Sequence, residues 1–224
     1  MSGILEGRVA IITGAGGGLG AAHAKVFASE GCAVVVNDIN TAAAQAVVDE
    51  ITKVGGKAVV NSSDITNYDD SLNAVRQAID SFGDLHIVVN NAGINRDRMF
   101  ASMTEQEWDA IMAVHLKGHF CISSHAVHYW RGQSKEGKPV DARIINTTSG
   151  AGLQGSIGQS NYAAAKAGIA ALTLNQAAEL ARYNITANAV APSARTGMTS
   201  AVPEMAARMA KPADGSFDHF AAEN

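Results

Sequence analysis

Six short apolar runs, rich in valine, isoleucine and alanine, recur along this chain with helical patterns between them. The runs lie at residues 8–13, 33–36, 58–61, 85–90, 143–146 and 185–190. Each is continuous rather than alternating, which is typical of strands whose two faces are both covered by helices. The long gaps between them have room for crossover helices. The pattern predicts an α/β domain with a doubly wound, mostly parallel sheet.

The intervening segments predict five helices and supply signals for their ends. The helical patterns cover residues 19–29, 42–54, 68–82, 105–130 and 160–183, and the fourth is long enough to expect a kink. Asn40 can cap the second helix and Gly55 can end it. Thr104, with Glu107 three residues later, has the pattern of a capping box. The polar residues 132–141 are expected to form a surface loop before the fifth strand.

Composition excludes several classes of protein. The 224 residues are 47% hydrophobic and 17% charged, with a net charge of -4, as expected for one folded domain over residues 1–224. The lysines and arginines form no cluster, so we expect no nucleic acid partner. No apolar run approaches the roughly 20 residues of a membrane helix. Cys32 and Cys121 are too few for a disulfide framework, and the N-terminus has no signal pattern, so we expect a cytoplasmic, reducing compartment.

The first predicted strand runs into a glycine-rich turn, Thr-Gly-Ala-Gly-Gly-Gly-Leu-Gly at residues 13–20. Glycines there let the backbone adopt positive φ and approach a pyrophosphate, whose charge meets free N–H groups at a helix N-terminus. Asp38, after the second strand, can accept hydrogen bonds from a ribose 2′-hydroxyl and would repel a 2′-phosphate. These features predict a Rossmann-type domain that binds NAD rather than NADP. The alternative for Asp38 is a local turn or cap.

Tyr162 and Lys166 are four residues apart on the predicted fifth helix and therefore share one face. Because an ammonium favours a nearby phenolate, we expect Lys166 to lower the pKa of Tyr162. Tyr162 is then the candidate acid/base for an alcohol or a carbonyl, and Ser149 is the candidate that holds the substrate oxygen. An isolated pair with this spacing would more often be a surface tyrosine and a solvated lysine.

Four motifs, in order, resemble those of the short-chain dehydrogenase/reductase family. They are TGxxxGxG at residues 13–20, NNAG at residues 90–93, a serine 13 residues before Tyr162, and YxxxK at residues 162–166. The resemblance extends over essentially the whole chain. It implies an oxidoreductase that interconverts a secondary alcohol and a ketone with a nicotinamide cofactor, and it makes Ser149, Tyr162 and Lys166 the catalytic set.

The resemblance also implies a set of cofactor-binding residues. They are Gly14, Gly18, Leu19, Gly20, Asp38, Asp64, Ile65, Asn91, Ala92, Gly93, Tyr162, Lys166 and Thr196. Asp64 could equally be the acid of a local turn, and Thr196 lies in a segment one residue shorter than the family's common pattern. The expected partners are a small-molecule substrate and further copies of the chain, as a homodimer or homotetramer, and not a membrane.

His115 departs from the family's pattern. It stands where the family usually has an asparagine whose main-chain carbonyl completes a proton relay, so we include it in the catalytic set. Its imidazole could exchange protons near pH 7, or it could simply pack and hydrogen-bond locally. His115 and His119 lack the glutamate of a zinc-protease helix, so no metal site is expected.

The C-terminal part departs as well. The family usually continues past the sixth strand, so we expect a missing strand within about 30 absent residues. Residues 190–224 are expected to cover the substrate.

His115 and the stretches at residues 158–162 and 188–192 resemble the (3R)-hydroxyacyl-CoA dehydrogenase units of peroxisomal multifunctional enzymes and 3-oxoacyl reductases. The resemblance favours NAD-dependent interconversion of a 3-hydroxyacyl thioester and its 3-oxo form. Four alternatives stay open: a steroid, sugar or polyol substrate, NADPH-dependent reduction of an acyl-carrier-protein substrate, a nucleotide sensor, and a scaffold without turnover.

Overall fold

A computed structural model describes residues 3–200, 203–214 and 216–222 of the chain. Within them, six parallel strands form one sheet in the order β3-β2-β1-β4-β5-β6. The strands are β1 (Val9–Thr13), β2 (Ala33–Asn37), β3 (Lys57–Asn61), β4 (Ile87–Asn90), β5 (Ala142–Thr147) and β6 (Ile185–Val190). The six predicted strands and the doubly wound parallel sheet are therefore confirmed. The strand order reverses between β1 and β4, and such a switch point is where ligands bind in sheets of this kind.

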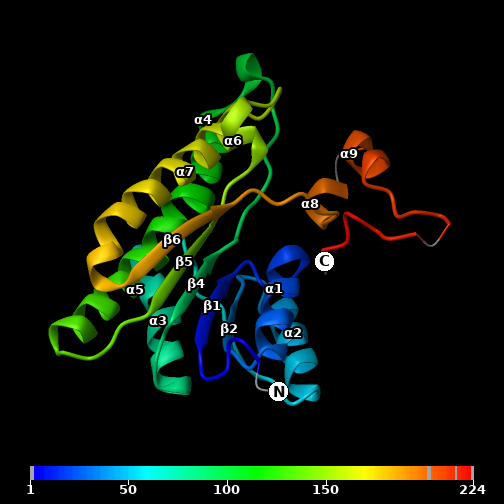
Figure 1. Cartoon of the computed structure of the whole chain (residues 1–224). Helices are drawn as coiled ribbons and strands as arrows, with labels where there is room; N and C mark the ends of the chain where they lie inside the picture. The colour runs from blue at the N-terminus through cyan, green and yellow to red at the C-terminus, as the bar shows by residue number, and fades with distance from the viewer. Residues whose placement is uncertain (1–2, 201–202, 215, 223–224) are drawn as a thin grey trace.

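Helices cover both faces of the sheet (Figure 1). They are α1 (Gly18–Ser29), α2 (Thr41–Lys53), α3 (Tyr68–Phe82), α4 (Glu105–Ile111), α5 (Gly118–Lys135), α6 (Gly150–Gln154), α7 (Ser160–Leu180), α8 (Gly197–Ser200) and α9 (Pro203–Arg208), with short turns η1 (Phe100–Ser102) and η3 (Ala181–Tyr183). The predicted capping box at Thr104 and Glu107 is confirmed. Asn40 caps α2 through its side chain, and Gly55, with φ +87, follows the end of that helix.

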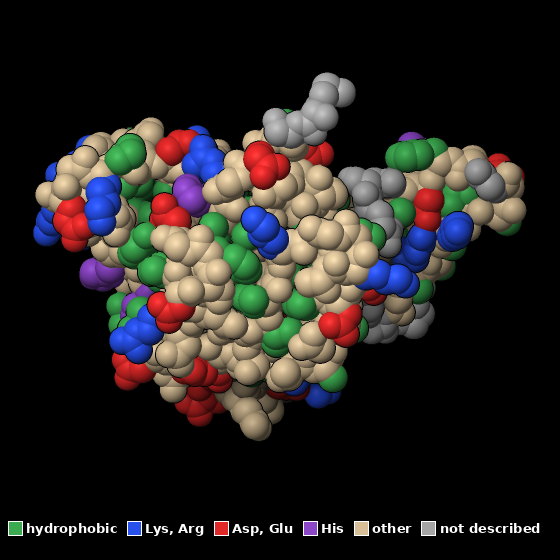
Figure 2. Space-filling model, turned by 90° about the horizontal axis from the view of Figure 1, so that it is seen from below, with side chains coloured by type: hydrophobic (Ala, Val, Ile, Leu, Met, Phe, Trp, Pro, Cys, Tyr) green, Lys and Arg blue, Asp and Glu red, His purple; other side chains and the backbone are tan. Residues whose placement is uncertain are grey.

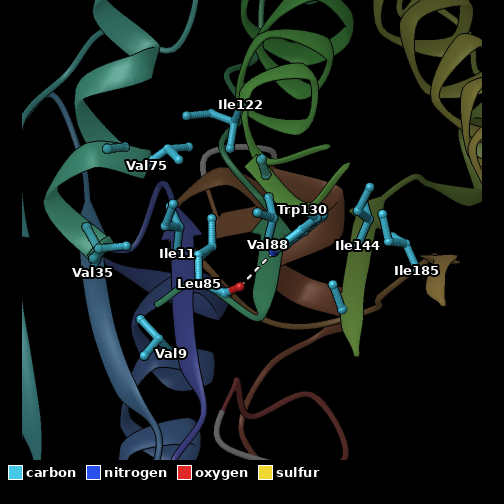
Figure 3. Close-up of a cluster of buried hydrophobic side chains, with 14 of the residues drawn as sticks. Val9, Ile11, Val35, Val75, Leu85, Val88, Ile122, Trp130, Ile144 and Ile185 are labelled. Carbon is cyan, nitrogen blue, oxygen red and sulfur yellow. Dashed lines mark hydrogen bonds between the residues drawn. The ribbon is translucent and has the colours of Figure 1, made fainter. Parts of the chain in front are cut away.

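The core has two layers because successive residues of a strand point to opposite faces. Val9 and Ile11 of β1 pack with α3 and α5, whereas Ala10 and Ile12 pack with α1 and α2. Figure 3 shows the first layer, in which the indole Nε1 of Trp130 donates a 2.6 Å hydrogen bond to the main-chain oxygen of Leu85. The partner for this buried N–H lets the core include a tryptophan without an unpaired donor.

The predicted kinked helix at residues 105–130 is three pieces. A π-helical segment, η2 (Met112–Lys117), separates α4 from α5. Segments of this kind are often found at functional sites. The predicted start of the loop at residues 132–141 is wrong, because α5 continues to Lys135. Gly132 lies inside the helix, and it is Gly137, with φ +77, that turns the chain away.

The segment after β6 leaves the sheet and carries α8 and α9 to one side of the molecule (Figures 1 and 2). Arg195 links distant parts of this segment, because its main-chain N–H donates to the Phe220 carbonyl at 2.6 Å and its guanidinium donates to the Met209 carbonyl at 2.7 Å and pairs with Asp218. Residues 201–202, 215 and 223–224 of this segment lie outside the described residues. Its expected role in covering a substrate stays a prediction.

Candidate active site

The glycine-rich turn joins β1 to α1 at the carboxyl end of the sheet. Gly14 and Gly18 adopt φ values of +62 and +52, which other residues rarely adopt. A Cβ at Gly14 would lie 2.7 Å from the Cα of Ala92, and one at Gly20 would lie 2.2 Å from the main-chain oxygen of Gly14. The turn therefore needs glycine both for its backbone angles and for the close approach of neighbouring main chain.

Thr13 and Asn91 hold this turn in place. The Thr13 hydroxyl accepts from the main-chain N–H groups of Asn91 and Ala92 at 3.0 and 3.1 Å. The Asn91 amide donates to the carbonyl of Thr13 at 3.0 Å and to that of Gly14 at 3.3 Å. The side chain of Asn91 thus braces the turn, and its predicted role as a cofactor residue stays a prediction. Thr13 was missed, although its place at the end of a strand, beside the glycines, was a usable signal.

Asp38 lies against the same turn. Its Oδ2 accepts from the Gly16 N–H at 3.0 Å and its Oδ1 accepts from the Asn40 N–H at 2.9 Å. The carboxylate therefore takes part in a local turn, as the alternative reading supposed, and it also stands at the edge of the glycine-rich turn. These positions are compatible with binding a ribose hydroxyl, which remains a prediction.

Other predicted cofactor residues lie in different surroundings. Leu19 is half-buried in the first turn of α1. Asp64 accepts from the N–H and hydroxyl of Thr66, both at 2.8 Å, and so forms a local turn. Ile65 is 6% exposed in the core. Thr196 is brought beside the glycine-rich turn, since a Cβ at Gly18 would lie 3.4 Å from its side chain.

Ser149, the N-cap of α6, comes together with Tyr162 and Lys166 of α7. The Ser149 Oγ caps α6 by accepting from the Ala151 N–H at 3.2 Å, and the same side chain hydrogen-bonds Tyr162. The Lys166 Nζ lies 5.5 Å from the centre of the Tyr162 ring and donates to the Thr147 carbonyl at 2.6 Å. Lys166 is only 2% exposed. A phenol, a hydroxyl and an ammonium thus meet in one place.

The predicted lowering of the Tyr162 pKa is wrong for the chain by itself. Burial raises this pKa, the hydrogen bond from Ser149 opposes the rise, and the charge of Asp97 adds to it. Burial also lowers the pKa of Lys166 to about 7, so this group is only partly protonated at neutral pH. Desolvation is the largest cause of both shifts, because it penalises the charged form of each group.

His115 packs against Tyr162. The two ring centres are 5.2 Å apart at an interplanar angle of 86°. Its Nε2 lies 2.8 Å from the main-chain oxygen and 3.0 Å from the main-chain nitrogen of Ile94. Burial, and then the charge of Lys166, lower the pKa of His115 to about 3. The prediction that the His115 imidazole exchanges protons near pH 7 is therefore wrong, because the ring stays neutral there. The alternative, that His115 packs and hydrogen-bonds locally, agrees with the geometry.

Asn161, the residue before Tyr162, anchors the start of α7, and sequence reasoning missed it. It is fully buried, and its amide donates to the carbonyls of Arg96 and Glu107 at 3.1 and 3.2 Å. Its oxygen accepts from the Tyr162 N–H at 2.8 Å. Asn161 thus ties the start of α7 to the segments after β4.

A dinucleotide fits these residues. The glycine-rich turn presents main chain without side chains at the start of α1, where a pyrophosphate is favoured. The carboxylate of Asp38 stands beside that turn. In the described part of the chain, no cluster of three or more histidine, cysteine, aspartate or glutamate side chains could hold a metal ion.

Comparisons with known proteins agree with one another. The family described as "short chain dehydrogenase" matches residues 8–207. Hydroxyacyl-CoA dehydrogenase ChsB1 of Mycobacterium tuberculosis is 50% identical over 205 residues, which are 88% of this chain and 64% of that protein. Peroxisomal multifunctional enzyme type 2 of Mus musculus is 42% identical over 92% of this chain and 28% of that protein. This chain thus spans less than two thirds of both.

Two further matches cover more of the matched chain. The 3-oxoacyl-[acyl-carrier-protein] reductase FabG of Thermotoga maritima is 39% identical over 90% of this chain and 80% of that protein. A crystal structure of a short chain dehydrogenase from Mycobacterium avium has a TM-score of 0.89 and 53% identity, covering 99% of this chain and 75% of the other.

Proposed function

Because this chain belongs to the short-chain dehydrogenase family, we propose that it interconverts a secondary alcohol and a ketone with NAD as cofactor. The observation that carries the proposal is the meeting of half-buried Ser149 and Tyr162 with the buried Lys166. Sequence motifs of this kind predict such a set, but only the fold can bring it together.

The three side chains have separate roles in the proposed reaction. Ser149 and Tyr162 hold the substrate oxygen between two hydroxyl groups. In the direction of oxidation, Tyr162 removes the hydroxyl proton, and in the direction of reduction it returns that proton. Lys166 supplies positive charge when protonated, which favours the phenolate of Tyr162. When bound, the nicotinamide ring supplies the acceptor or donor of the hydride.

The preference for NAD rests on the charge beside the turn. The carboxylate of Asp38 would repel the 2′-phosphate of NADP and could accept from the free hydroxyl of NAD. Asn37, next to it, is buried and gives its amide to Asn61 and Ser63, so it offers no positive charge to a phosphate.

The proposed substrate is a 3-hydroxyacyl thioester of coenzyme A. This choice is supported by the names of the relatives: a hydroxyacyl-CoA dehydrogenase at 50% identity, and a peroxisomal multifunctional enzyme. A second candidate is the reduction of a 3-oxoacyl group on acyl carrier protein. It is favoured by the FabG relative, because this chain covers 80% of that protein's length.

Assembly and compartment are part of the proposal. We expect a homodimer or homotetramer in a reducing cytoplasm. The thiols of Cys32 and Cys121 are both free and buried, which agrees with such a compartment. Within the described residues, no helix combines the length and the apolar character needed to cross a membrane.

The test is a steady-state assay with (3R)-hydroxybutyryl-CoA and either NAD or NADP, followed by absorbance of the reduced nicotinamide. We expect turnover with NAD, and a loss of about 100-fold or more in kcat for Tyr162→Phe. Tyr129→Phe is the matched control, since its hydroxyl contacts Asp84 at 2.8 Å, away from the site. Turnover that Tyr162→Phe leaves unchanged would contradict the proposal. A preference for the acyl-carrier-protein thioester would favour the second candidate.

A further inference from the structure

A hollow lies at the far end of α7, away from the candidate active site. It is an open depression of about 550 Å³ between α5, the last turn of α7 and the short turn η3, and we call it the η3 hollow. Figure 1 shows this end of α7 beside the start of β6, at the opposite end of the helix from α6. Because a helix rises about 1.5 Å per residue, the hollow lies about 25 Å or more from Tyr162 along the helix axis. It is therefore separate from the place where the proposed reaction occurs.

Two arginines from different elements converge on one tyrosine in the η3 hollow. The Cζ atoms of Arg131, from α5, and Arg182, from η3, lie 5.4 and 4.8 Å from the centre of the Tyr183 ring. Tyr183 is half-buried and packs against the first core layer. Burial acts to raise the pKa of Tyr183, but the hydrogen bonds and the charges of the two arginines outweigh it and lower that pKa. Two positive charges therefore meet at one phenol.

Neither guanidinium has a carboxylate partner in the described part of the chain. The ion pairs there join other basic side chains, and Glu179, which also lines the η3 hollow, takes part in none of them. The Nε of Arg131 is buried and has no hydrogen-bond partner among the described residues. Such an atom is rare in native proteins and calls for a bound water or ion. The two arginines thus have charge and donors that the chain itself leaves unused.

A structural role at the end of α7 does not account for this arrangement. Basic side chains near the end of a helix often donate to its last carbonyls. Within the described residues, however, the polar contacts of Arg131 and Arg182 are with Tyr183. Attraction to an aromatic ring holds each cation weakly, while two like charges at one ring repel each other. An anion bound between the guanidiniums would remove that repulsion.

A phosphate monoester fits the η3 hollow better than a carboxylate does. At neutral pH it carries a charge of about -1.5 to -2 and three acceptor oxygens, whereas a carboxylate carries one charge and two oxygens. A guanidinium binds two oxygens through parallel N–H donors, so the phosphate is the group that can serve two guanidiniums and a phenol together. Val127 and Leu180 line the hollow as an apolar wall for the body of the ester, and Glu179 offers an acceptor to a hydroxyl or amino group on it.

We propose that the η3 hollow binds a phosphate monoester through Arg131, Arg182 and the hydroxyl of Tyr183. The guanidiniums bind the terminal phosphate oxygens, and the phenol donates to one of them. Because the hollow is remote from Tyr162, the ester bound there is not the alcohol or ketone that reacts in the same protomer. Two sources share this chemistry: a free nucleotide, with its phosphate on the 5′ oxygen, and coenzyme A, with a phosphate on the 3′ oxygen of its adenosine. The site stands whether or not the proposed function is correct.

The first experiment is an NMR titration of the whole chain, labelled with ¹⁵N-arginine, in the presence of saturating NAD so that the dinucleotide site is filled. The probes are phenyl phosphate, 3′-AMP and 5′-AMP. We expect the side-chain signals of Arg131 and Arg182 to shift with a single Kd of about 1 mM or below, and binding to weaken as salt is added. Tighter binding of 3′-AMP would favour coenzyme A as the source, and tighter binding of 5′-AMP a free nucleotide. Signals that none of the probes shifts in a saturable way would overturn the proposal.

Variants of the η3 hollow supply the second test. Arg131→Gln and Arg182→Gln should each weaken phenyl phosphate binding about tenfold, because each removes charge-assisted hydrogen bonds. Arg131→Lys, which keeps the charge but loses the planar fork, should recover only part of the affinity. Arg76→Gln is the matched control, since Arg76 is exposed on α3 and does not line the hollow. An equal loss of binding in Arg76→Gln would show non-specific attraction and refute the site.

A third measurement uses the unchanged chain and therefore does not depend on whether a variant folds. In protein labelled with ¹³C-tyrosine, the pKa of Tyr183 should rise when inorganic phosphate is bound, because the anion offsets the two positive charges that lower it. The signal is assigned by its loss in Tyr183→Phe. A Tyr183 titration that phosphate leaves unchanged would contradict the proposed contacts. None of these measurements needs turnover, so a chain that oxidised no alcohol would defeat the proposed function and leave this result to be decided separately.

Discussion

Gly93→Ala tests how tightly the site around Tyr162 is packed. A Cβ at residue 93 would lie 2.5 Å from the Cε1 of His115, so the contact must open by about 1 Å to reach ordinary separation. The imidazole has little room to move, because it is 1% exposed and held between Ile94 and Tyr162. Overpacking of this kind costs about 1–3 kcal/mol, which for a chain of this size lowers Tm by roughly 2–12 °C.

The assay is thermal and urea unfolding of Gly93→Ala, of His115→Asn and of the double variant. Because asparagine is smaller, we expect the alanine to cost at least about 1 kcal/mol less beside Asn than beside His. Gly132→Ala is the control, since nothing lies within 4 Å of its added Cβ. That helical substitution should stabilise by about 0.5–1 kcal/mol. An equal cost of Gly93→Ala in both backgrounds would refute the reasoning.

Three other substitutions test charges of the site. Asp97→Asn should lower the Tyr162 pKa, because the Asp97 charge raises it, and should move the acidic limb of the kcat/KM profile to lower pH. Lys166, whose folded pKa of about 7 lies below its unfolded value, makes stability rise with pH above 7, because the unfolded chain binds the extra proton. Urea unfolding should show that rise, and Lys166→Met should abolish it. Asp38→Ser should reduce the preference for NAD over NADP by about tenfold or more, measured as a ratio of kcat/KM.

Sequence reasoning succeeded where local rules decide the outcome. The strands β1, β2 and β4 are short apolar runs buried on both faces, and such runs need no distant partner to be recognised. The capping box at Thr104 and Glu107 is likewise a contact between residues three apart. The π-helical segment at η2 and the end of α5 beyond Gly132 were less accessible, because packing against other elements overrides intrinsic helix preference.

Sequence reasoning about the site succeeded in naming residues and failed on their electrostatics. The spacing of Tyr162 and Lys166 shows that they share a helix face, but not that Tyr162 is half-buried and Lys166 buried. Burial decides the direction of both pKa shifts, and it depends on strands and helices far away in the chain. Thr13 and Asn161 were missed for a related reason, since their partners lie far from them in sequence.

By itself, the order of residues determined the parallel sheet, the glycine-rich turn and the identity of the residues that could carry the chemistry. Each of these follows from periodicity or from a motif in which the members are close along the chain. The tertiary structure alone decided that His115 is a neutral packing partner of Tyr162 and that Lys166 is buried. The physical reason is that solvent exclusion and the approach of distant charges exist only after the chain has folded.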